Sequence, residues 1–87
     1  MKYTVVWKSA AKRQIAEIWM QSPNRKEVTA AANAIDAALR HQPHNCGESR
    51  GGSFRLVIEL PLGVFYAVNE EDWLVTVFYV RYIPSRS

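Results

Sequence analysis

The stretch from residue 53 to residue 82, SFRLVIELPLGVFYAVNEEDWLVTVFYVRY, decides the fold of this chain. It contains three apolar runs of strand length that are rich in β-branched and aromatic residues. The segments PLG at 61–63 and EED at 70–72 separate the runs, and both have the composition of short turns. Three strands joined by short turns predict an antiparallel meander.

Residue parity predicts which side of each strand is buried. In the first run, Phe54, Leu56, Ile58 and Leu60 alternate with more polar positions, so we expect this set to face the core. Arg55 is then expected to face solvent. Most aromatic side chains of the chain are expected to pack in the core.

The last apolar run has no polar side. One parity holds Val75, Val77 and Tyr79, and the other holds Leu74, Phe78 and Val80. A strand that is apolar at both parities is typical of a position covered on both faces, in the middle of a sheet or under helices.

The residues upstream of the meander predict one strand and two helices. A strand at residues 3–7 precedes a helix that has Ser9 as its N-cap and ends near Gln21, before a proline. Asn24 is the predicted N-cap of a second helix, which ends near His41.

The order of these elements predicts the fold class. At 87 residues the chain is expected to form a single domain over residues 1–87. The order βααβββ predicts an α+β two-layer domain in which a helical hairpin packs on one face of an antiparallel sheet. We expect the first strand to pair at an edge of the meander, with Ile35 and Val77 in the core.

Composition bounds the cellular setting. Cys46 is the only cysteine, so an internal disulfide is excluded and a reducing compartment is favoured. Strand-like residues directly follow Lys2, and no apolar run approaches the length of a membrane span. We therefore expect a cytoplasmic protein without a signal peptide or membrane contact.

Positive charge is concentrated in the first part of the chain. Residues 1–55 hold nine Lys and Arg against four acidic residues, and residues 56–87 hold two against four. This asymmetry favours an anionic partner, either a nucleic acid or an acidic protein. A solvated basic surface without a partner is the alternative.

The sequence offers little support for a metal site or for a catalytic nucleophile. His41, His44 and Cys46 lie close together in the sequence, but the second pair of ligands that a structural zinc site needs is absent. No third residue that could orient a Cys–His pair is identifiable. We expect neither a metal nor a cofactor.

Arginine residues around the glycine-rich segment 42–52 form the predicted functional surface. If this segment folds back over the sheet, Arg50, Arg55 and Arg81 could converge on one anion, with Tyr82 as an aromatic neighbour. The predicted groups for binding RNA are Arg40, His44 and Arg50.

Several segments resemble one known family. They are the opening YTVVW, the pattern A-x-x-x-I-x-x-I-W that follows it, LRHQP at 39–43, and FRLVIELPLGVFYAVNEEDWLVTVFYV at 54–80. In pattern and order they resemble the RelE/ParE superfamily, the toxin half of bacterial type II toxin–antitoxin (plasmid stabilisation) systems. The resemblance covers nearly the whole chain, although no single motif in it is highly specific.

The resemblance implies a function and partners. RelE-like members are endoribonucleases that cleave mRNA on the ribosome without a metal, and ParE-like members poison DNA gyrase. It implies a small cytoplasmic toxin that binds a cognate antitoxin, with mRNA or gyrase as its target. A homodimer is a further expectation, and no membrane partner is expected.

The resemblance also implies site residues. Arg55, Arg81 and Tyr82 match, loosely, the basic and aromatic groups that RelE-like toxins use for catalysis. Gly63 stands where those toxins carry a catalytic arginine. The alternative is therefore a protein of the same fold that has lost the chemistry and only binds, or a gyrase inhibitor of the ParE type.

Overall fold

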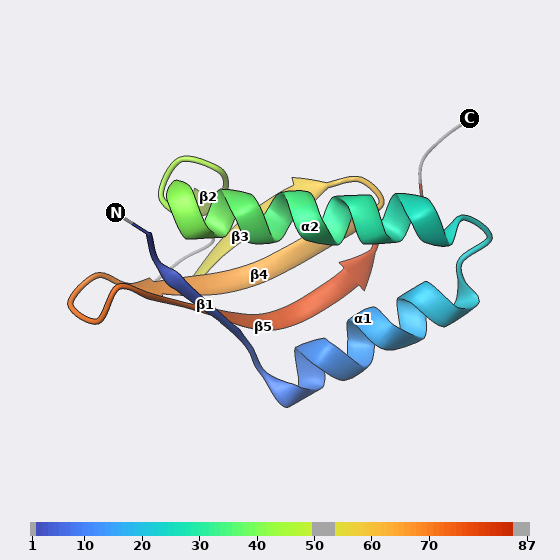
Figure 1. Ribbon diagram of the computed structural model, residues 1–87, viewed down its shortest axis with the longest axis horizontal. Helices are drawn as coiled ribbons and strands as arrows, with labels where there is room; N and C mark the ends of the chain where they lie inside the picture. Colours follow the sequence, from blue (N-terminus) through green and yellow to red (C-terminus); the bar gives the residue numbers. More distant parts are fainter. Residues whose placement is uncertain (1, 50–53, 85–87) are drawn as a thin grey trace.

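The computed structural model describes residues 2–49 and 54–84, which form two helices and a five-stranded sheet (Figure 1). The predicted order is confirmed, with one short additional strand between the helices and the meander. The elements are β1 Thr4–Trp7, α1 Ser9–Gln21, α2 Arg25–His41, β2 Glu48–Ser49, β3 Phe54–Glu59, β4 Leu62–Asn69 and β5 Leu74–Tyr82.

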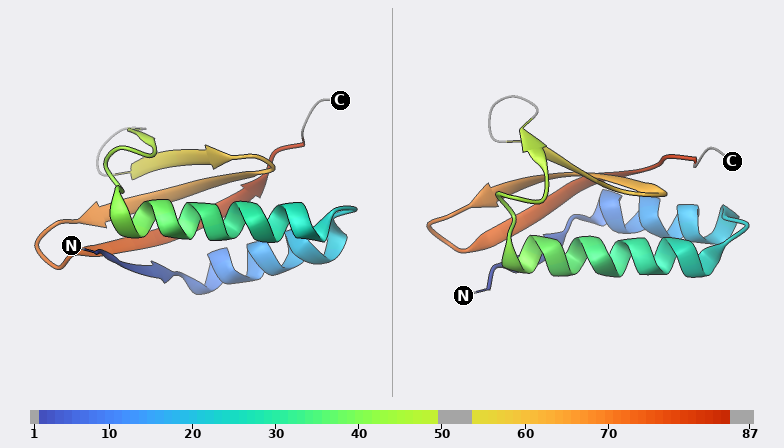
Figure 2. Two further views of the ribbon diagram at one scale, coloured as in Figure 1. Left: turned by 45° about the horizontal axis from the view of Figure 1, so that its top comes forward. Right: turned by 90° about the horizontal axis from the view of Figure 1, so that it is seen from above.

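The sheet has the strand order β1-β5-β4-β3-β2. β3, β4 and β5 form the predicted antiparallel meander, and β1 joins its edge beside β5, as expected. The pairing of β1 with β5 is parallel, so the sheet is mixed and not antiparallel throughout as predicted; the long connection between the two strands, which contains both helices, permits this pairing. Both helices lie on the same side of the sheet (Figure 2). The predicted α+β two-layer fold is therefore confirmed.

Local capping explains the helix boundaries. The side chain of Asn24 accepts a hydrogen bond from the backbone N–H of Glu27 at 3.1 Å, which confirms Asn24 as the N-cap of α2. Ser9 is not the N-cap of α1 as predicted; it is the first helical residue, and Lys8 occupies the cap without a side-chain hydrogen bond. None of the described helices is long and apolar enough to cross a membrane.

The core lies between the helices and the covered side of the sheet. Ile35 is 1% exposed and Val77 is 0% exposed, so both predicted core positions are confirmed. The other buried apolar residues are Val5, Ala11, Val28, Ala31, Leu39, Val57, Leu62, Val64, Tyr66, Val75 and Val80.

The predicted parity of β3 is wrong. Val57 is the buried residue, at 6% exposure, whereas Phe54 and Ile58 are 47% and 53% exposed. The pairing with β4 places Val57 opposite the buried Val64, so the covered side takes the parity that contains Arg55. The richer apolar stripe of β3 lies on the side that no helix covers.

The predicted parity of β5 fails after Val77. In the β4–β5 register Phe65 pairs with Tyr79 and Tyr66 pairs with Val77, so Phe78 is an additional residue in a β-bulge. The alternation of side chains shifts by one at this point. Tyr79 therefore does not share a face with Val77, and Val80 returns to the core at 2% exposure.

Candidate functional site

The side of the sheet opposite the helices, here called the open face, carries a group of apolar and aromatic side chains. Its members are exposed or half-exposed, in contrast to the expectation that the aromatic residues are mostly core. They are Val6, Phe54, Leu56, Ile58, Phe65, Phe78 and Tyr79. An exposed cluster of this kind on a sheet is typical of a binding surface.

Two pairs of aromatic rings organise the open face. Phe54 and Phe78 meet edge to face, with ring centroids 5.2 Å apart. They reach each other across β4 because Ala67, the partner of Phe54 in the register, is small. Phe65 and Tyr79 are direct cross-strand partners with centroids 6.0 Å apart. Tyr79 is 46% exposed, so an aromatic surface remains available to a ligand.

Two cations belong to the open face. Lys8 follows β1, and its Nζ lies 5.6 Å from the centroid of the Phe78 ring. Arg81 is exposed near the end of β5 and pairs with Gly63 of β4. The open-face positions of β1, β4 and β5, all of them described residues, carry no acidic side chain. This part of the sheet is therefore electropositive.

Gly63 leaves room for the side chain of Arg81. A Cβ atom added at Gly63 would lie 2.9 Å from Cδ1 of Ile83 and 3.4 Å from Cγ of Arg81. A larger residue at position 63 would therefore displace Ile83. At Gly63, where the resemblance implies an arginine, the aliphatic part of the Arg81 side chain borders the position from the neighbouring strand.

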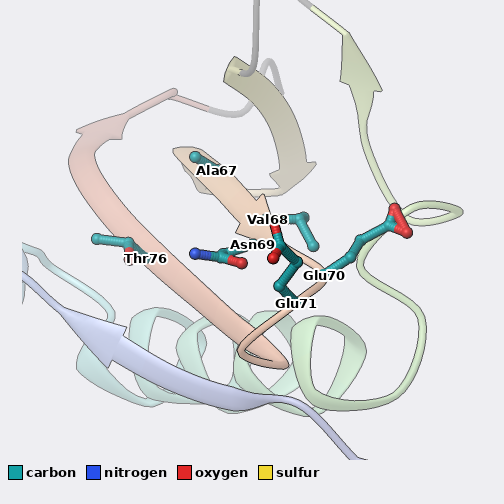
Figure 3. A pocket seen from close by; sticks show the side chains of 6 residues that line it. All are labelled: Ala67, Val68, Asn69, Glu70, Glu71 and Thr76. Carbon is teal, nitrogen blue, oxygen red and sulfur yellow. The ribbon is translucent and has the colours of Figure 1, made fainter.

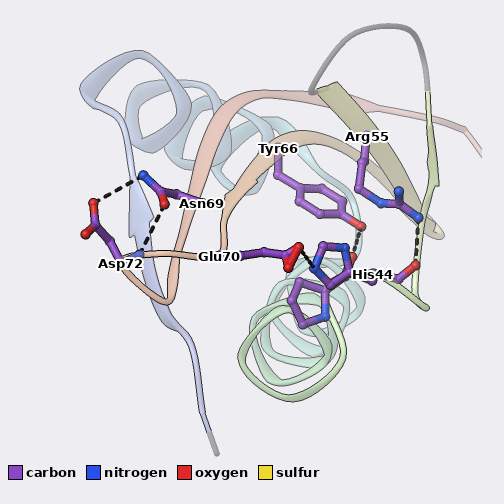
Figure 4. Close-up of polar contacts among 7 residues, drawn as sticks. His44, Arg55, Tyr66, Asn69, Glu70 and Asp72 are labelled. Carbon is purple, nitrogen blue, oxygen red and sulfur yellow. Dashed lines mark hydrogen bonds and ion pairs between the residues drawn. The ribbon is translucent and has the colours of Figure 1, made fainter.

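Arg55 lies on the covered side of the sheet, so its predicted solvent-facing position is wrong. Its Nη2 donates a hydrogen bond to the carbonyl oxygen of His44 at 2.7 Å (Figure 4) and another to the carbonyl oxygen of Gly47 at 2.8 Å. The Nε atom is buried without a hydrogen-bond partner. Arg55 and Arg81 are thus on opposite sides of the sheet, and Arg55 holds the segment after α2.

Tyr66 anchors the same segment. It is fully buried, and its hydroxyl donates to the carbonyl oxygen of Pro43 at 2.6 Å (Figure 4). Cys46 Sγ lies 3.7 Å from this hydroxyl. Burial, followed by the hydrogen bond with Cys46, raises the pKa of Tyr66 to about 12, although Arg55 nearby acts to lower it. These contacts make Arg55, Tyr66 and Cys46 a structural cluster.

The predicted RNA-binding residues Arg40 and His44 lie at the end of the molecule that holds the β4–β5 turn. Arg40 donates to Asp36 at 2.7 Å, and its carbonyl oxygen accepts from the N–H of Tyr3. His44 Nε2 lies 3.5 Å from a carboxylate oxygen of Glu70 (Figure 4), and the rings of His44 and Tyr3 form a T-shaped pair with centroids 6.3 Å apart. The structure brings these two residues together, far along β5 from Arg81.

Tyr82 borders the same shallow hollow as Arg81, beside Glu17 of α1, although the two residues occupy opposite sides of the sheet. Tyr82 shares its side of the sheet with Leu62 and lines a small cavity with Ile18 and Pro23 of the helical layer. Arg50 lies outside the described residues. The predicted convergence of Arg50, Arg55, Arg81 and Tyr82 on one anion is therefore not what the described residues form.

A shallow pocket of about 490 Å³ lies at the β4–β5 turn (Figure 3). Its lining is acidic because it includes two glutamates. The lining residues are Ala67, Val68, Asn69, Glu70, Glu71 and Thr76. The pocket therefore borders the electropositive part of the sheet with negative charge.

The helical layer carries a second apolar surface. A groove of about 410 Å³ runs between α1 and α2, beside Trp19 at 42% and Met20 at 67% exposure. Arg25 closes the hairpin by donating to the carbonyl oxygens of these two residues, and its guanidinium lies 4.8 Å from the centroid of the Trp19 ring.

Sequence reasoning missed the residues that dominate the open face. Phe54, Phe78 and Tyr79 are assigned to packing when parity alone is counted, and Lys8 appears as one basic residue among many. One signal was available in β3. Arg55, Val57 and Glu59 share one parity, and the other parity is entirely apolar. The apolar parity can be the uncovered one if it forms a binding surface.

Searches for similar proteins give matches in structure alone. No family model and no curated protein matches the sequence. The toxin–antitoxin complex RelBE2 from Mycobacterium tuberculosis contains a chain similar to this one, with a TM-score of 0.79 and 15% identity over 94% of this chain and 92% of that chain.

Two further solved structures agree. A chain of the chromosomal ParDE system from P. aeruginosa has a TM-score of 0.69 and 13% identity over 94% of this chain and 97% of that one. The isolated E. coli RelE toxin has a TM-score of 0.66 and 16% identity over 98% of this chain and 88% of that chain. The chain therefore has the RelE/ParE toxin fold, as its sequence resemblance implied.

Proposed function

We propose that this protein is the toxin of a type II toxin–antitoxin pair and that its open face contacts RNA. The observation that carries the proposal is the pairing of exposed aromatic rings with the cations Lys8 and Arg81 on one side of a sheet. Aromatic rings stack on unpaired bases, and Lys and Arg bind phosphates. The similar solved structures support the toxin assignment, because they are toxins and toxin–antitoxin complexes.

Arg81 is the residue that we assign to the phosphate. Its guanidinium can donate two parallel hydrogen bonds to a phosphate and stabilise the charge that develops there during metal-free cleavage. Arg55 is not assigned this role, because its Nη2 is engaged by the carbonyl oxygens of His44 and Gly47.

A second candidate is a toxin that binds its target without cleaving it, as a gyrase inhibitor does. The observation in its favour is that the open-face positions of β1, β4 and β5 hold neither a carboxylate nor an imidazole to act as general base; the carboxylate beside Arg81 is that of Glu17, on α1. Gly63 also lacks the side chain that the resemblance expects.

The partner that we propose is an acidic antitoxin. The groove between α1 and α2 is apolar, and the adjoining hollow is lined by Trp19, Arg25 and Lys26. An amphipathic acidic helix fits such a groove because its apolar side can bury Trp19 and Met20 while its carboxylates face the two cations. Co-expression with the neighbouring reading frame should give a complex that survives low salt, and separate elution would contradict this partner.

The main test compares growth, RNA cleavage and RNA binding for the wild type and Arg81→Gln. We expect wild type to arrest growth and to bind single-stranded RNA more weakly as salt rises, because phosphate contacts release counterions. Arg81→Gln should relieve the arrest and lower the salt slope by about one.

Arg13→Gln is the matched control, since Arg13 is an exposed arginine of α1. Growth arrest with RNA binding but without cleavage would select the binding-only toxin. Arrest with inhibition of gyrase supercoiling and no RNA binding would select the gyrase inhibitor. Absence of arrest would contradict the toxin assignment itself.

A further inference from the structure

The β-bulge in β5 places two consecutive aromatic side chains where a regular strand would place one. Neighbouring residues of a strand normally point to opposite faces. Here Phe78 is the unpaired residue between Val77 and Tyr79, and both Phe78 and Tyr79 reach rings on the open face. The bulge is therefore the reason that the Phe78 ring lies on the open face.

A residue of the opposite layer fixes the backbone at this bulge. The N–H of Val80 donates a 2.8 Å hydrogen bond to Oε1 of Gln14, which lies on α1. The pairing of β1 with β5 stops at Trp7 and Val77, so β1 does not reach this part of β5. Gln14 therefore holds the chain two residues beyond Phe78.

The surroundings of Phe78 indicate the chemistry of its ligand. The ring is half-exposed, and Lys8 Nζ lies 5.6 Å from its centroid. A flat apolar ring beside a mobile cation suits a planar base attached to a phosphate. The two carboxylates of Glu70 and Glu71 at the β4–β5 turn repel a phosphate, whereas the single carboxylate near Arg81, that of Glu17, lies beside an arginine. The RNA backbone is therefore directed from Lys8 toward Arg81.

Building on the proposed contact with RNA, we propose that Phe78 stacks on an unpaired base, that Lys8 contacts the adjoining phosphate, and that Gln14 positions Phe78 from the helical side of the sheet. Gln14 is a positioning residue, because it touches the backbone of β5 from α1. Lys8 and Phe78 are the groups that touch the ligand.

The first experiment measures a single-stranded RNA oligonucleotide that contains 2-aminopurine, whose fluorescence falls when it stacks on an aromatic ring. Wild type should quench this fluorescence. Phe78→Leu keeps an apolar side chain but should lose the quenching and bind about tenfold to a hundredfold more weakly. Trp73→Leu, which removes a ring of 39% exposure at the β4–β5 turn, should match wild type.

The second experiment separates positioning from contact. Gln14→Leu removes the acceptor for Val80 N–H and should reduce the quenching, while the dependence of binding on salt stays as in wild type. Gln14→Glu restores an acceptor oxygen and should restore the quenching, which a change in helix packing alone would not predict. Lys8→Gln should lower the salt slope by about one, and Lys12→Gln, one turn into α1, should not.

The outcomes distinguish this proposal from the proposed function. If wild type and Phe78→Leu bind and quench equally, the stacking role is wrong, although the contact between the open face and RNA stands. If Gln14→Leu quenches as wild type does, the positioning role is wrong. If wild type binds no RNA at low salt, both the stacking role and the RNA contact are overturned, and growth arrest alone decides whether the protein is a toxin.

Discussion

The guanidinium of Arg55 links the sheet to the segment that follows α2. Its Nη2 bridges the carbonyl oxygens of His44 and Gly47, and the Tyr66 hydroxyl binds Pro43 beside it. These contacts satisfy backbone groups that no strand or helix pairs, which is why this glycine-containing segment can adopt one conformation.

Arg55→Ala should destabilise the protein. The substitution removes two charge-assisted hydrogen bonds, of which the one to Gly47 is partly buried, so the free energy of unfolding should fall by about 2 kcal/mol in urea denaturation. Arg81→Ala removes an exposed arginine and should change it by less than about 0.5 kcal/mol. Equal effects of the two substitutions would mean that Arg55 does not hold this segment.

Tyr66→Phe should remove part of the dependence of stability on alkaline pH. The pKa of Tyr66 is raised to about 12 in the folded protein and is near 10 when unfolded, so folding favours the protonated phenol. This contribution is fully present below about pH 10 and is lost as pH rises through about 12.

The stability difference between wild type and Tyr66→Phe should therefore shrink between about pH 10 and pH 12. Denaturation at a series of pH values measures it. Tyr79→Phe, which removes an exposed hydroxyl on the open face, is the matched control. A difference that stays constant over this range would contradict the assigned pKa.

At the scale of elements, the sequence predicts most of what local chemistry decides. Asn24, followed three residues later by Glu27, marks the start of α2, and short segments of turn composition mark the meander. Side-chain parity failed in β3 and β5 for a physical reason. The choice of covered face depends on where the helices pack, and a bulge shifts the alternation without a local signal at Phe78.

The candidate site was predicted less well than the fold for the same reason. Arg81 was predicted and lies on the open face, whereas Arg55 and Tyr82 lie on the covered side of the sheet. The side of the sheet that an arginine occupies decides whether its guanidinium is available to a ligand or binds backbone carbonyl oxygens. That face is a property of the packed molecule, so the composition of the strand could not reveal it.

Asn24→Ala should cost about 1 kcal/mol of stability, because the side chain satisfies the N–H of Glu27 at the start of α2. Ser9→Ala should be close to neutral, since Ser9 is helical and makes no cap hydrogen bond. Thermal unfolding of the two variants compares a real cap with an apparent one. A larger loss for Ser9→Ala than for Asn24→Ala would reverse this assignment.

At the scale of the whole molecule, one layer of helices covers one side of the sheet and leaves the other apolar side exposed. Ile35→Ala opens a cavity in the covered core and should cost about 2–4 kcal/mol. Ile58→Ala removes a side chain that is 53% exposed on the open face and should cost far less. Comparable losses, measured by urea denaturation, would show that the open face is covered in solution.

The parallel pairing of β1 with β5 has a consequence for biosynthesis. Thr4 lies beside Leu74, seventy positions further along the chain. A nascent polypeptide therefore presents β1 at the start of translation but receives its partner only when nearly the whole chain has emerged. The same late strand carries Phe78, Tyr79 and Arg81, so a prematurely terminated product lacks both the strand that pairs with β1 and the residues of the proposed RNA contact.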